Sequence, residues 1–147
     1  DQGTLRERDA LIDVDCDIWI PAARPDVIND DNVERLRARL VVPGANIATT
    51  PGAERYLFEH DVLCVPDFIA NAGGVICAAV EYRGGSEAEA VAAIEEKIRD
   101  NTAAVLERSR AESLLPRKAA TDLALERVRH AMASRRHHLF SAAPAFA

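Results

Sequence analysis

The stretch that decides the fold is a short apolar run closed by a proline, Asp61-Val62-Leu63-Cys64-Val65-Pro66. Its continuous apolar character predicts a strand that is buried on both faces, as in a parallel sheet. Two runs of the same kind come earlier in the chain, at residues 16–21 and 40–42. Because a helical pattern separates each run from the next, the chain is expected to make right-handed β-α-β crossovers.

Helical patterns fill both intervals between these strands. Asp30-Asp31-Asn32 is a helix-start signal, and apolar residues spaced from Val33 to Leu40 predict a short helix after it. Thr49-Thr50-Pro51 predicts a second helix, with a threonine cap and proline at the first helical position. The first half of the chain therefore alternates strands with short helices.

The second half of the chain carries helical patterns. A helix is expected from about Val75 to Tyr82, after the turn that Ala72-Gly73-Gly74 allows. Ser86, with Glu89 three residues later, predicts a capping box at the start of a long helix. A connector and a last helix complete this half.

These elements predict one α/β domain over residues 1–147, a partial Rossmann-like parallel sheet of about three strands followed by C-terminal helices. The β/α part covers residues 1–83, the helical part residues 86–140 with its connector at 110–116, and a loose tail residues 141–147. A doubly wound sheet usually has about six strands. The chain is therefore expected to be the second half of a larger coenzyme domain, or to form a homo-oligomer through its open sheet edge.

Composition and charge exclude several classes of protein. A length of 147 residues suits a single domain, and 48% apolar residues can build a core. The formal net charge of -6 disfavours nucleic acid as a partner, because an acidic surface repels a phosphate backbone. No apolar run reaches the 18 or so residues that a membrane span requires, so no membrane partner is expected.

Cysteine usage bears on metal binding and on compartment. Cys16, Cys64 and Cys77 are an odd number without a C-x-x-C pair, which argues against a disulfide framework and against a zinc site. Each is expected to be a small buried hydrophobe. A reducing cytoplasmic location fits this pattern, and no metal site is expected.

The carboxyl ends of the strands are where an open parallel sheet binds its ligands. Small residues follow all three expected strands, at Ala22-Ala23, at Gly44-Ala45-Asn46 and at Asn71-Ala72-Gly73-Gly74, and two of these ends carry an asparagine. Small residues let a flat ligand approach the backbone, and an asparagine amide offers a donor and an acceptor to a carboxamide or a ribose hydroxyl. Turn residues and helix caps are the alternative interpretation of the same pattern.

Four longer blocks stand in order along residues 10–135. They are Asp15-Cys16-Asp17-Ile18-Trp19-Ile20-Pro21-Ala22-Ala23, Val41-Val42-Pro43-Gly44-Ala45-Asn46, Thr49-Thr50-Pro51 and Val65-Pro66-Asp67-Phe68-Ile69-Ala70-Asn71-Ala72-Gly73-Gly74-Val75. Together they resemble the C-terminal part of the glutamate/leucine/phenylalanine/valine dehydrogenase family. The resemblance implies the C-terminal half of an NAD(P)-binding Rossmann domain. It also implies reversible oxidative deamination of an L-amino acid to a 2-oxo acid and ammonia, with NAD or NADP as cofactor.

The resemblance assigns cofactor roles residue by residue. Ala22 and Ala23 would line the nicotinamide ribose, Asn46 would bond that ribose or the neighbourhood of the ring, and Asn71 would hold the nicotinamide carboxamide.

Substrate roles fall on the helix after the glycines. Val75 and Ala78, at positions i and i+3, would face the substrate side chain. Glutamate-specific members of the family place a hydroxyl residue where Ala78 stands. An apolar amino acid is therefore favoured over glutamate.

Two parts of the family's machinery have no matching block. No G-x-G-x-x-G loop occurs, and the catalytic lysine and aspartate of the family are unmatched, since the two lysines Lys97 and Lys118 lie on helix patterns. No catalytic residue is therefore assigned, and the isolated chain is expected to be inactive with weak or no cofactor binding. The alternative function is a non-catalytic dehydrogenase remnant that self-associates or docks on a larger subunit.

Overall fold

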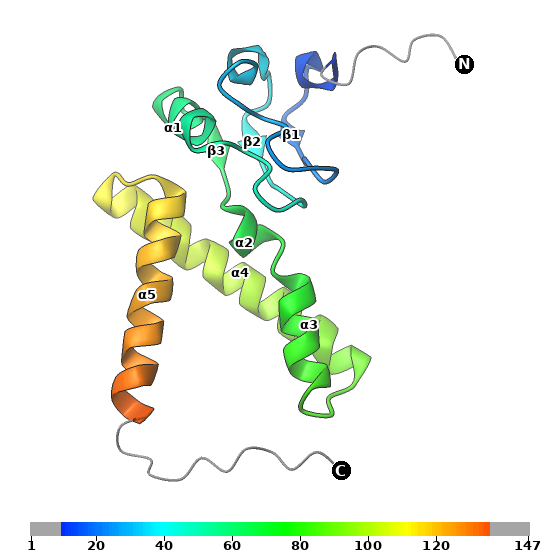
Figure 1. The fold of residues 1–147 in the computed structure, drawn as a ribbon, viewed down its shortest axis with the longest axis vertical. Coiled ribbons are helices and arrows are strands. Elements are labelled where there is room, and N and C mark those ends of the chain that lie inside the picture. The colour runs from blue at the N-terminus through cyan, green and yellow to red at the C-terminus, as the bar shows by residue number, and fades with distance from the viewer. Residues whose placement is uncertain (1–9, 136–147) are drawn as a thin grey trace, which may run out of the picture.

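The computed structural model describes residues 10–135, with a β/α part at one end and three longer helices extending from it (Figure 1). A 3₁₀ helix at Ala10–Asp13 leads into the chain. The strands are β1 (Ile18–Trp19), β2 (Leu40–Val41) and β3 (Leu63–Cys64), and the helices are α1 (Pro51–Glu59), α2 (Asp67–Ala70), α3 (Gly73–Glu81), α4 (Glu87–Glu112) and α5 (Pro116–Arg135).

The three strands form one parallel sheet in the order β1-β2-β3. Ile18 pairs with Leu40, and Leu40 pairs in turn with Leu63 on its other side, so β2 is the central strand. The predicted α/β class with three parallel strands is therefore confirmed. Beyond the strands, an isolated parallel bridge joins Ile28 to Thr49, with the Ile28 amide donating to the Ala48 carbonyl at 3.0 Å.

The β/α part and the helical part each have their own cluster of buried apolar side chains. The first lies between the sheet and α1 and consists of Ile28, Val33, Val41, Ala53, Leu57 and Cys64. The second joins α4 to α5 through Val105, Ala119 and Ala120. Because each fully buried aliphatic side chain contributes about 1.5–3 kcal/mol, the larger first cluster is the main source of stability.

α4 connects the other long helices, with α3 packed on its first half and α5 on its second half (Figure 1). Its predicted capping box is confirmed, because Ser86 Oγ accepts from the Glu89 amide and the Glu89 carboxylate accepts from the Ser86 amide at 2.7 Å. The predicted start of α1 is confirmed as well. Thr50 Oγ1 accepts from the Ala53 amide at 3.3 Å, and Pro51 is the first helical residue.

The predicted helix over residues 33–40 is wrong. The chain makes a 3₁₀ helix at Val33–Arg35 and is extended from Leu36, and Leu40 lies in β2. The side chain of Asn32 explains the difference, because it bonds backward to Asn29 N at 2.9 Å and to Val27 O at 3.0 Å and caps no helix. The helix-start signal therefore closes a loop here.

Three features of the chain after β3 also differ from the prediction. α2 was not predicted, since four residues are too few to show helical periodicity. α3 begins at Gly73, two residues earlier than expected. The expected connector at 110–116 is shorter, because α4 continues to Glu112 and turns through Ser113 in the left-handed conformation (φ 51°).

The cysteines do not share one environment. Cys64 is buried as expected, and burial raises the pKa of its thiol to about 12. Cys16 and Cys77 are only half-buried, so the expectation of a buried hydrophobe is wrong for these two. Both lie on segments with little covering structure, next to β1 and on α3.

Candidate functional site

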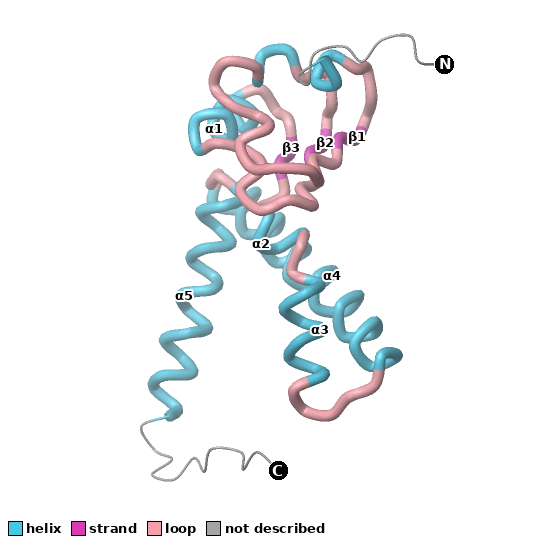
Figure 2. The backbone as a smooth tube through the Cα atoms, turned by 45° about the vertical axis from the view of Figure 1, so that its right-hand side comes forward, coloured by secondary structure: helices cyan, strands magenta, loops and turns pink. Residues whose placement is uncertain are grey.

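The loops that follow the strands meet at one edge of the sheet, because the strands are parallel. Figure 2 shows them gathered below the strands, on the side where α2 follows β3. The amides of Gly44 and Ala45 both donate to the Pro21 carbonyl, at 3.0 and 2.9 Å, which joins the loop after β2 to the loop after β1. A Cβ atom at Gly44 would lie 3.0 Å from the Cβ of Ala22. A side chain at position 44 would therefore crowd Ala22.

Asn46 and Asn71 meet at this edge from the ends of two different strands. Asn71 Nδ2 donates to Asn46 Oδ1 at 2.7 Å and lies 3.5 Å from the Gly44 carbonyl oxygen. Within residues 10–135, Asn46 Nδ2 and Asn71 Oδ1 make no hydrogen bond. The pair therefore presents one amide donor and one carbonyl acceptor, the complement of a carboxamide.

The two alanines lie beside this pair and carry no functional group. Ala22 and Ala23 are both exposed, and Ala22 is the one in contact with Gly44. Their methyl side chains leave the backbone of the loop after β1 accessible. The structure thus brings Ala22 to Gly44 and Asn46 to Asn71, while Ala23 remains on the exposed part of its loop.

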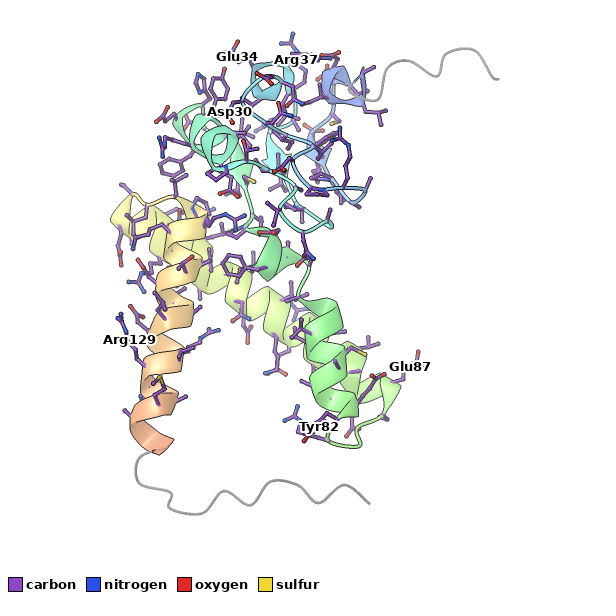
Figure 3. All side chains as sticks on the ribbon, viewed as in Figure 1. Asp30, Glu34, Arg37, Tyr82, Glu87 and Arg129 are labelled. Atoms are coloured by element: carbon purple, nitrogen blue, oxygen red, sulfur yellow. The ribbon has the colours of Figure 1, made fainter. Side chains whose placement is uncertain are left out.

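Val75 and Ala78 lie on the exposed side of α3. Val75 is 78% exposed, and Ala78 is exposed as well. The other side of α3 packs on α4 at Gly73, whose backbone lies against Ile94, and at the buried Val80. Tyr82, labelled in Figure 3, marks the end of α3 that is farthest from the sheet. The helix thus presents two apolar side chains within two turns of Asn71.

A buried acid, Asp67, anchors the edge. Its Oδ2 accepts from the Ile47 amide at 2.7 Å, and its Oδ1 accepts from Arg117 at 2.7 Å. Arg117 also donates to both carboxylate oxygens of Glu54, at 2.6 and 2.7 Å, and lies over the ring of Phe68. The acids are nearly buried, and the guanidinium is about one third exposed.

The electrostatics of this cluster agree with its geometry. Burial opposes the ionisation of Asp67, but the bonds from the Ile47 amide and from Arg117 outweigh burial and hold the pKa of this carboxyl below its ordinary value. The Glu54 carboxylate is the largest cause of the raised pKa of Arg117. Asp67 and Arg117 are therefore charged at neutral pH, and Arg117 bonds to both Asp67 and Glu54.

Sequence reasoning missed Arg117 and Glu54 entirely. Glu54 lies on the same side of α1 as Leu57, at i and i+3, so an acid on the apolar face was the available signal. Asp67 stands in the fourth block that carries the resemblance, but the sequence assigns it no role. No local sequence pattern pairs Arg117 with Asp67, which lies 50 positions earlier, or with Glu54, which lies 63 positions earlier.

A separate cavity of about 280 Å³ lies between the end of α1, β3 and the turn from α4 to α5. Phe58, Leu63 and Leu115 give it an apolar lining. Three of the polar side chains that line it, those of Glu54, Arg117 and Ser109, bond to groups of this chain. Because Asn46 and Asn71 do not line this cavity, the sheet edge is the better candidate site.

Metal and membrane chemistry find no support in the part of the chain that the structure describes. Over residues 10–135, no three His, Cys, Asp or Glu side chains gather as metal ligands do. No helix in that range has the length and apolar character to cross a membrane.

The sequence model for the family described as Glutamate/Leucine/Phenylalanine/Valine dehydrogenase matches residues 1–136. The chain belongs to this family. The resemblance that the four sequence blocks carried is therefore confirmed.

Curated members of the dehydrogenase family are similar over much of the chain. An "NADP(+)-dependent glutamate dehydrogenase" of Pyrobaculum calidifontis is 43% identical over 138 residues, 89% of this chain and 33% of the relative. An "NAD-specific glutamate dehydrogenase" of Staphylococcus aureus is 46% identical over 72 residues, 49% of this chain and 17% of the relative. The chain spans a third or less of the length of these relatives.

Solved structures of amino-acid dehydrogenases have the same fold. The L-tryptophan dehydrogenase of Nostoc punctiforme has a TM-score of 0.78 and 26% identity, over 85% of this chain and 38% of that one. The hetero-hexameric glutamate dehydrogenase of Thermus thermophilus, in a Leu-bound form, has a TM-score of 0.74 and 26% identity, over 90% of this chain and 33% of that one. The α/β architecture is thus that of amino-acid dehydrogenases.

The side chains at this sheet edge can be compared with the chemistry of the nicotinamide end of NAD(P). The alanines at 22 and 23 add no bulk, and Gly44 is in contact with Ala22. Asn46 Nδ2 and Asn71 Oδ1 match the acceptor and the donor of a nicotinamide carboxamide.

Proposed function

We propose that this chain supplies the nicotinamide-side half of the cofactor site of an NAD(P)-dependent amino-acid dehydrogenase. The reaction of that enzyme is the reversible oxidative deamination of an L-amino acid to a 2-oxo acid and ammonia. The observation that carries the proposal is the Asn46–Asn71 pair at the carboxyl edge of the sheet, in a chain that belongs to this family.

The proposed work of these residues is to orient a ring. Asn71 Oδ1 accepts from the carboxamide amine, and Asn46 Nδ2 donates to the carboxamide oxygen or to the adjoining ribose. The alanines at 22 and 23 let the ribose approach the backbone. Holding one face of the ring toward the substrate converts a bimolecular encounter into an oriented one. The nicotinamide, when bound, supplies the hydride chemistry.

We place proton transfer and pyrophosphate binding outside these residues. Asp67 is an acid next to the asparagine loops, but its oxygens are bonded to Arg117 and to the Ile47 amide. The chain matches about a third of its longer relatives, which leaves room in them for both functions. No catalytic residue is therefore proposed within residues 10–135.

The names of the curated relatives support L-glutamate as the substrate. The relative that matches 89% of the chain is named a glutamate dehydrogenase. This similarity runs over the whole matched region, whereas the apolar preference rested on the methyl group of Ala78. We therefore propose glutamate as the substrate, in place of the apolar amino acid expected from sequence.

An apolar or aromatic amino acid is the second candidate. Val75 and Ala78 present only hydrocarbon on the exposed side of α3, and the similar Nostoc punctiforme structure is named an L-tryptophan dehydrogenase. The ratio of kcat/KM for glutamate and for leucine, measured on the protein that carries this sequence, decides between the candidates. A ratio above one supports glutamate, and a ratio below one returns the apolar preference.

Removal of the Asn71 side chain tests the proposed cofactor role. We expect the chain to bind NADH with a Kd of about 1 mM (roughly -4 kcal/mol), because the adenosine half lacks its own contacts. Asn71→Ala is expected to weaken this binding by about fivefold or more, the value of one hydrogen bond of about 1 kcal/mol. Trp19 fluorescence and heat, followed in one titration, measure both affinities.

Asn101→Ala is the matched control for this titration. Asn101 lies on α4 and accepts from Arg127, far along the chain from the sheet edge. Its loss is expected to leave NADH binding unchanged. Equal binding by the Asn71→Ala chain and the unaltered chain would remove the asparagine pair from the site.

Self-association would serve either function, including that of a non-catalytic module. Ile18 and Ile20 are 53% and 64% exposed at the β1 edge of the sheet. Covering this edge buries apolar surface and unpaired backbone groups. We therefore propose a homo-oligomer that pairs through β1.

Ile20→Lys is expected to shift this chain from dimer toward monomer, because it places a charge on the edge that is covered. Analytical sedimentation of both chains over a concentration series measures the shift. Val128→Lys, a change at a residue 55% exposed on α5, serves as the control. A monomer at every concentration before any substitution would contradict edge pairing.

A further inference from the structure

We propose that Arg117 is a positioning residue for the nicotinamide edge: it acts through Asp67 to hold the loop that carries Asn46. This inference rests on the proposed function, because the asparagine pair is its endpoint. Arg117 itself lies on α5, outside the edge, and touches neither asparagine through a hydrogen bond.

The first contact is the Asp67 carboxylate, which accepts one hydrogen bond with each of its oxygens. Asp67 Oδ1 accepts from Arg117 and Asp67 Oδ2 accepts from the amide of Ile47, each at 2.7 Å. Rotation of the Asp67 side chain would break both bonds at once. The guanidinium therefore fixes the acceptor that the loop amide needs.

The second contact is at Ile47, a loop residue whose backbone conformation is unfavourable for its residue type. Ile47 has a φ of 52°, in the left-handed region that a β-branched residue rarely occupies. Its side chain is 61% exposed, so packing does little to keep it there. Two hydrogen bonds hold this conformation: the Ile47 amide donates to Asp67, and the Ile47 carbonyl accepts from the Asp26 amide at 2.8 Å. Asn46 is the preceding residue and moves with the same peptide unit.

The third contact joins Asp67 to Asn71. The amide of Asn71 donates to the backbone carbonyl of Asp67 at 2.8 Å, at the end of α2. Asp67 therefore touches the Asn46 loop through its side chain and Asn71 through its backbone. Asp67 thus joins the two loops that carry the asparagines.

Arg117 is held firmly enough to act as an anchor. It grips the Glu54 carboxylate with Nε and a terminal nitrogen, and it lies 5.5 Å from the centre of the Phe68 ring. One planar guanidinium thus bonds two acids from different elements in fixed directions. A lysine keeps the charge but cannot reproduce this geometry.

Arg117→Lys is the test variant, and Arg108→Lys is its matched control. Arg108 pairs with Glu112 and Glu126 between α4 and α5, and it has no bond to the edge loops. The first readout is amide hydrogen exchange by NMR at Ile47, compared with Val65, whose amide donates to Val41 O within the sheet. The second readout is the affinity for reduced nicotinamide mononucleotide.

We expect Arg117→Lys to speed exchange at Ile47 by about tenfold more than at Val65, the effect of losing one charge-assisted hydrogen bond. Binding of reduced nicotinamide mononucleotide is expected to weaken in the same variant, and Arg108→Lys is expected to change neither. A merely structural arginine would speed exchange at Ile47 and Val65 equally.

Asp67→Asn provides a second variant if Arg117→Lys fails to fold. It keeps the shape of the side chain and weakens both bonds, so faster exchange at Ile47 is again expected. Uniform exchange in both variants, or selective exchange at Ile47 with unchanged nucleotide affinity, overturns the proposal. Failure of the proposed function is distinct from these outcomes. In that case the unaltered chain would not bind the nucleotide. The rate of amide exchange at Ile47, measured without ligand, would still depend on Arg117.

Discussion

Leu57→Ala is expected to lower the free energy of unfolding by about 3 kcal/mol, the middle of the range for a buried leucine truncated to alanine. Leu57 is 1% exposed and lies in the larger apolar cluster, beside Ile28 and Val41. Its removal leaves a cavity between α1 and the sheet that short strands of two residues cannot close. Total stability of a small domain is only about 5–15 kcal/mol, so this loss is large.

Urea denaturation of both chains measures the difference, and Leu125→Ala is the control. Leu125 is 45% exposed on α5, so its truncation is expected to cost less than about 1 kcal/mol. Similar losses at the two positions would mean that α1 does not pack on the sheet as described. Trp19, half-buried against the same cluster, reports the transition by fluorescence.

Glu54→Gln is expected to lower the free energy of unfolding by about 2–3 kcal/mol. Breaking a buried ion pair costs about 3–5 kcal/mol, and Arg117 lies at the lower end because its side chain is about one third exposed. The substitution keeps the size of the side chain, so the loss measures the interaction and not a cavity. Arg117 connects α1 to α5, and both parts of the chain depend on this contact.

Glu126→Gln is the matched control for the ion pair. Glu126 binds Arg108, but its side chain is 56% exposed, so the expected loss is below about 1 kcal/mol. A double-mutant cycle of Glu54→Gln with Arg117→Gln isolates the pairwise term. A coupling energy near zero would contradict the cluster.

Acid pH gives a further expectation for the same cluster. The pKa of Asp67 is held below its ordinary value in the folded chain, so its stabilising effect is present above the unfolded pKa and is lost as the pH falls through the folded pKa. The free energy of unfolding is therefore expected to decline below about pH 4. In Asp67→Asn this part of the decline is expected to be absent. Denaturation in a pH series measures it.

The sequence predicts local features of this fold well. The apolar run ending at Pro66 predicts a buried parallel strand because its side chains avoid water on both faces. Thr50 and Ser86 predict helix starts because their hydroxyls can satisfy free amides within three residues. These signals depend on neighbours in sequence. The parallel strand and both helix starts are confirmed, but burial on both faces of the strand is not, because Leu63 is only half-buried.

Long-range contacts are where sequence reasoning stops. The asparagine pair was foreseen only as two residues at one edge, and the 2.7 Å bond between them depends on the loop after β2. That loop is shaped by Ile47 in a conformation that isoleucine does not favour. The partners of Arg117 are set by the docking of α5, which no local pattern encodes. The helix expected after Asn32 fails for a similar reason, since its side chain bonds backward into the preceding loop.

We propose that this chain carries the nicotinamide half of a dinucleotide site and not the adenosine half. The most direct measurement is two-dimensional amide NMR of the chain, titrated separately with reduced nicotinamide mononucleotide and with AMP. We expect the nicotinamide nucleotide to shift the signals of Ala22, Asn46 and Asn71 and AMP to leave them unchanged. Equal shifts with both nucleotides, or shifts confined to other residues, would contradict it.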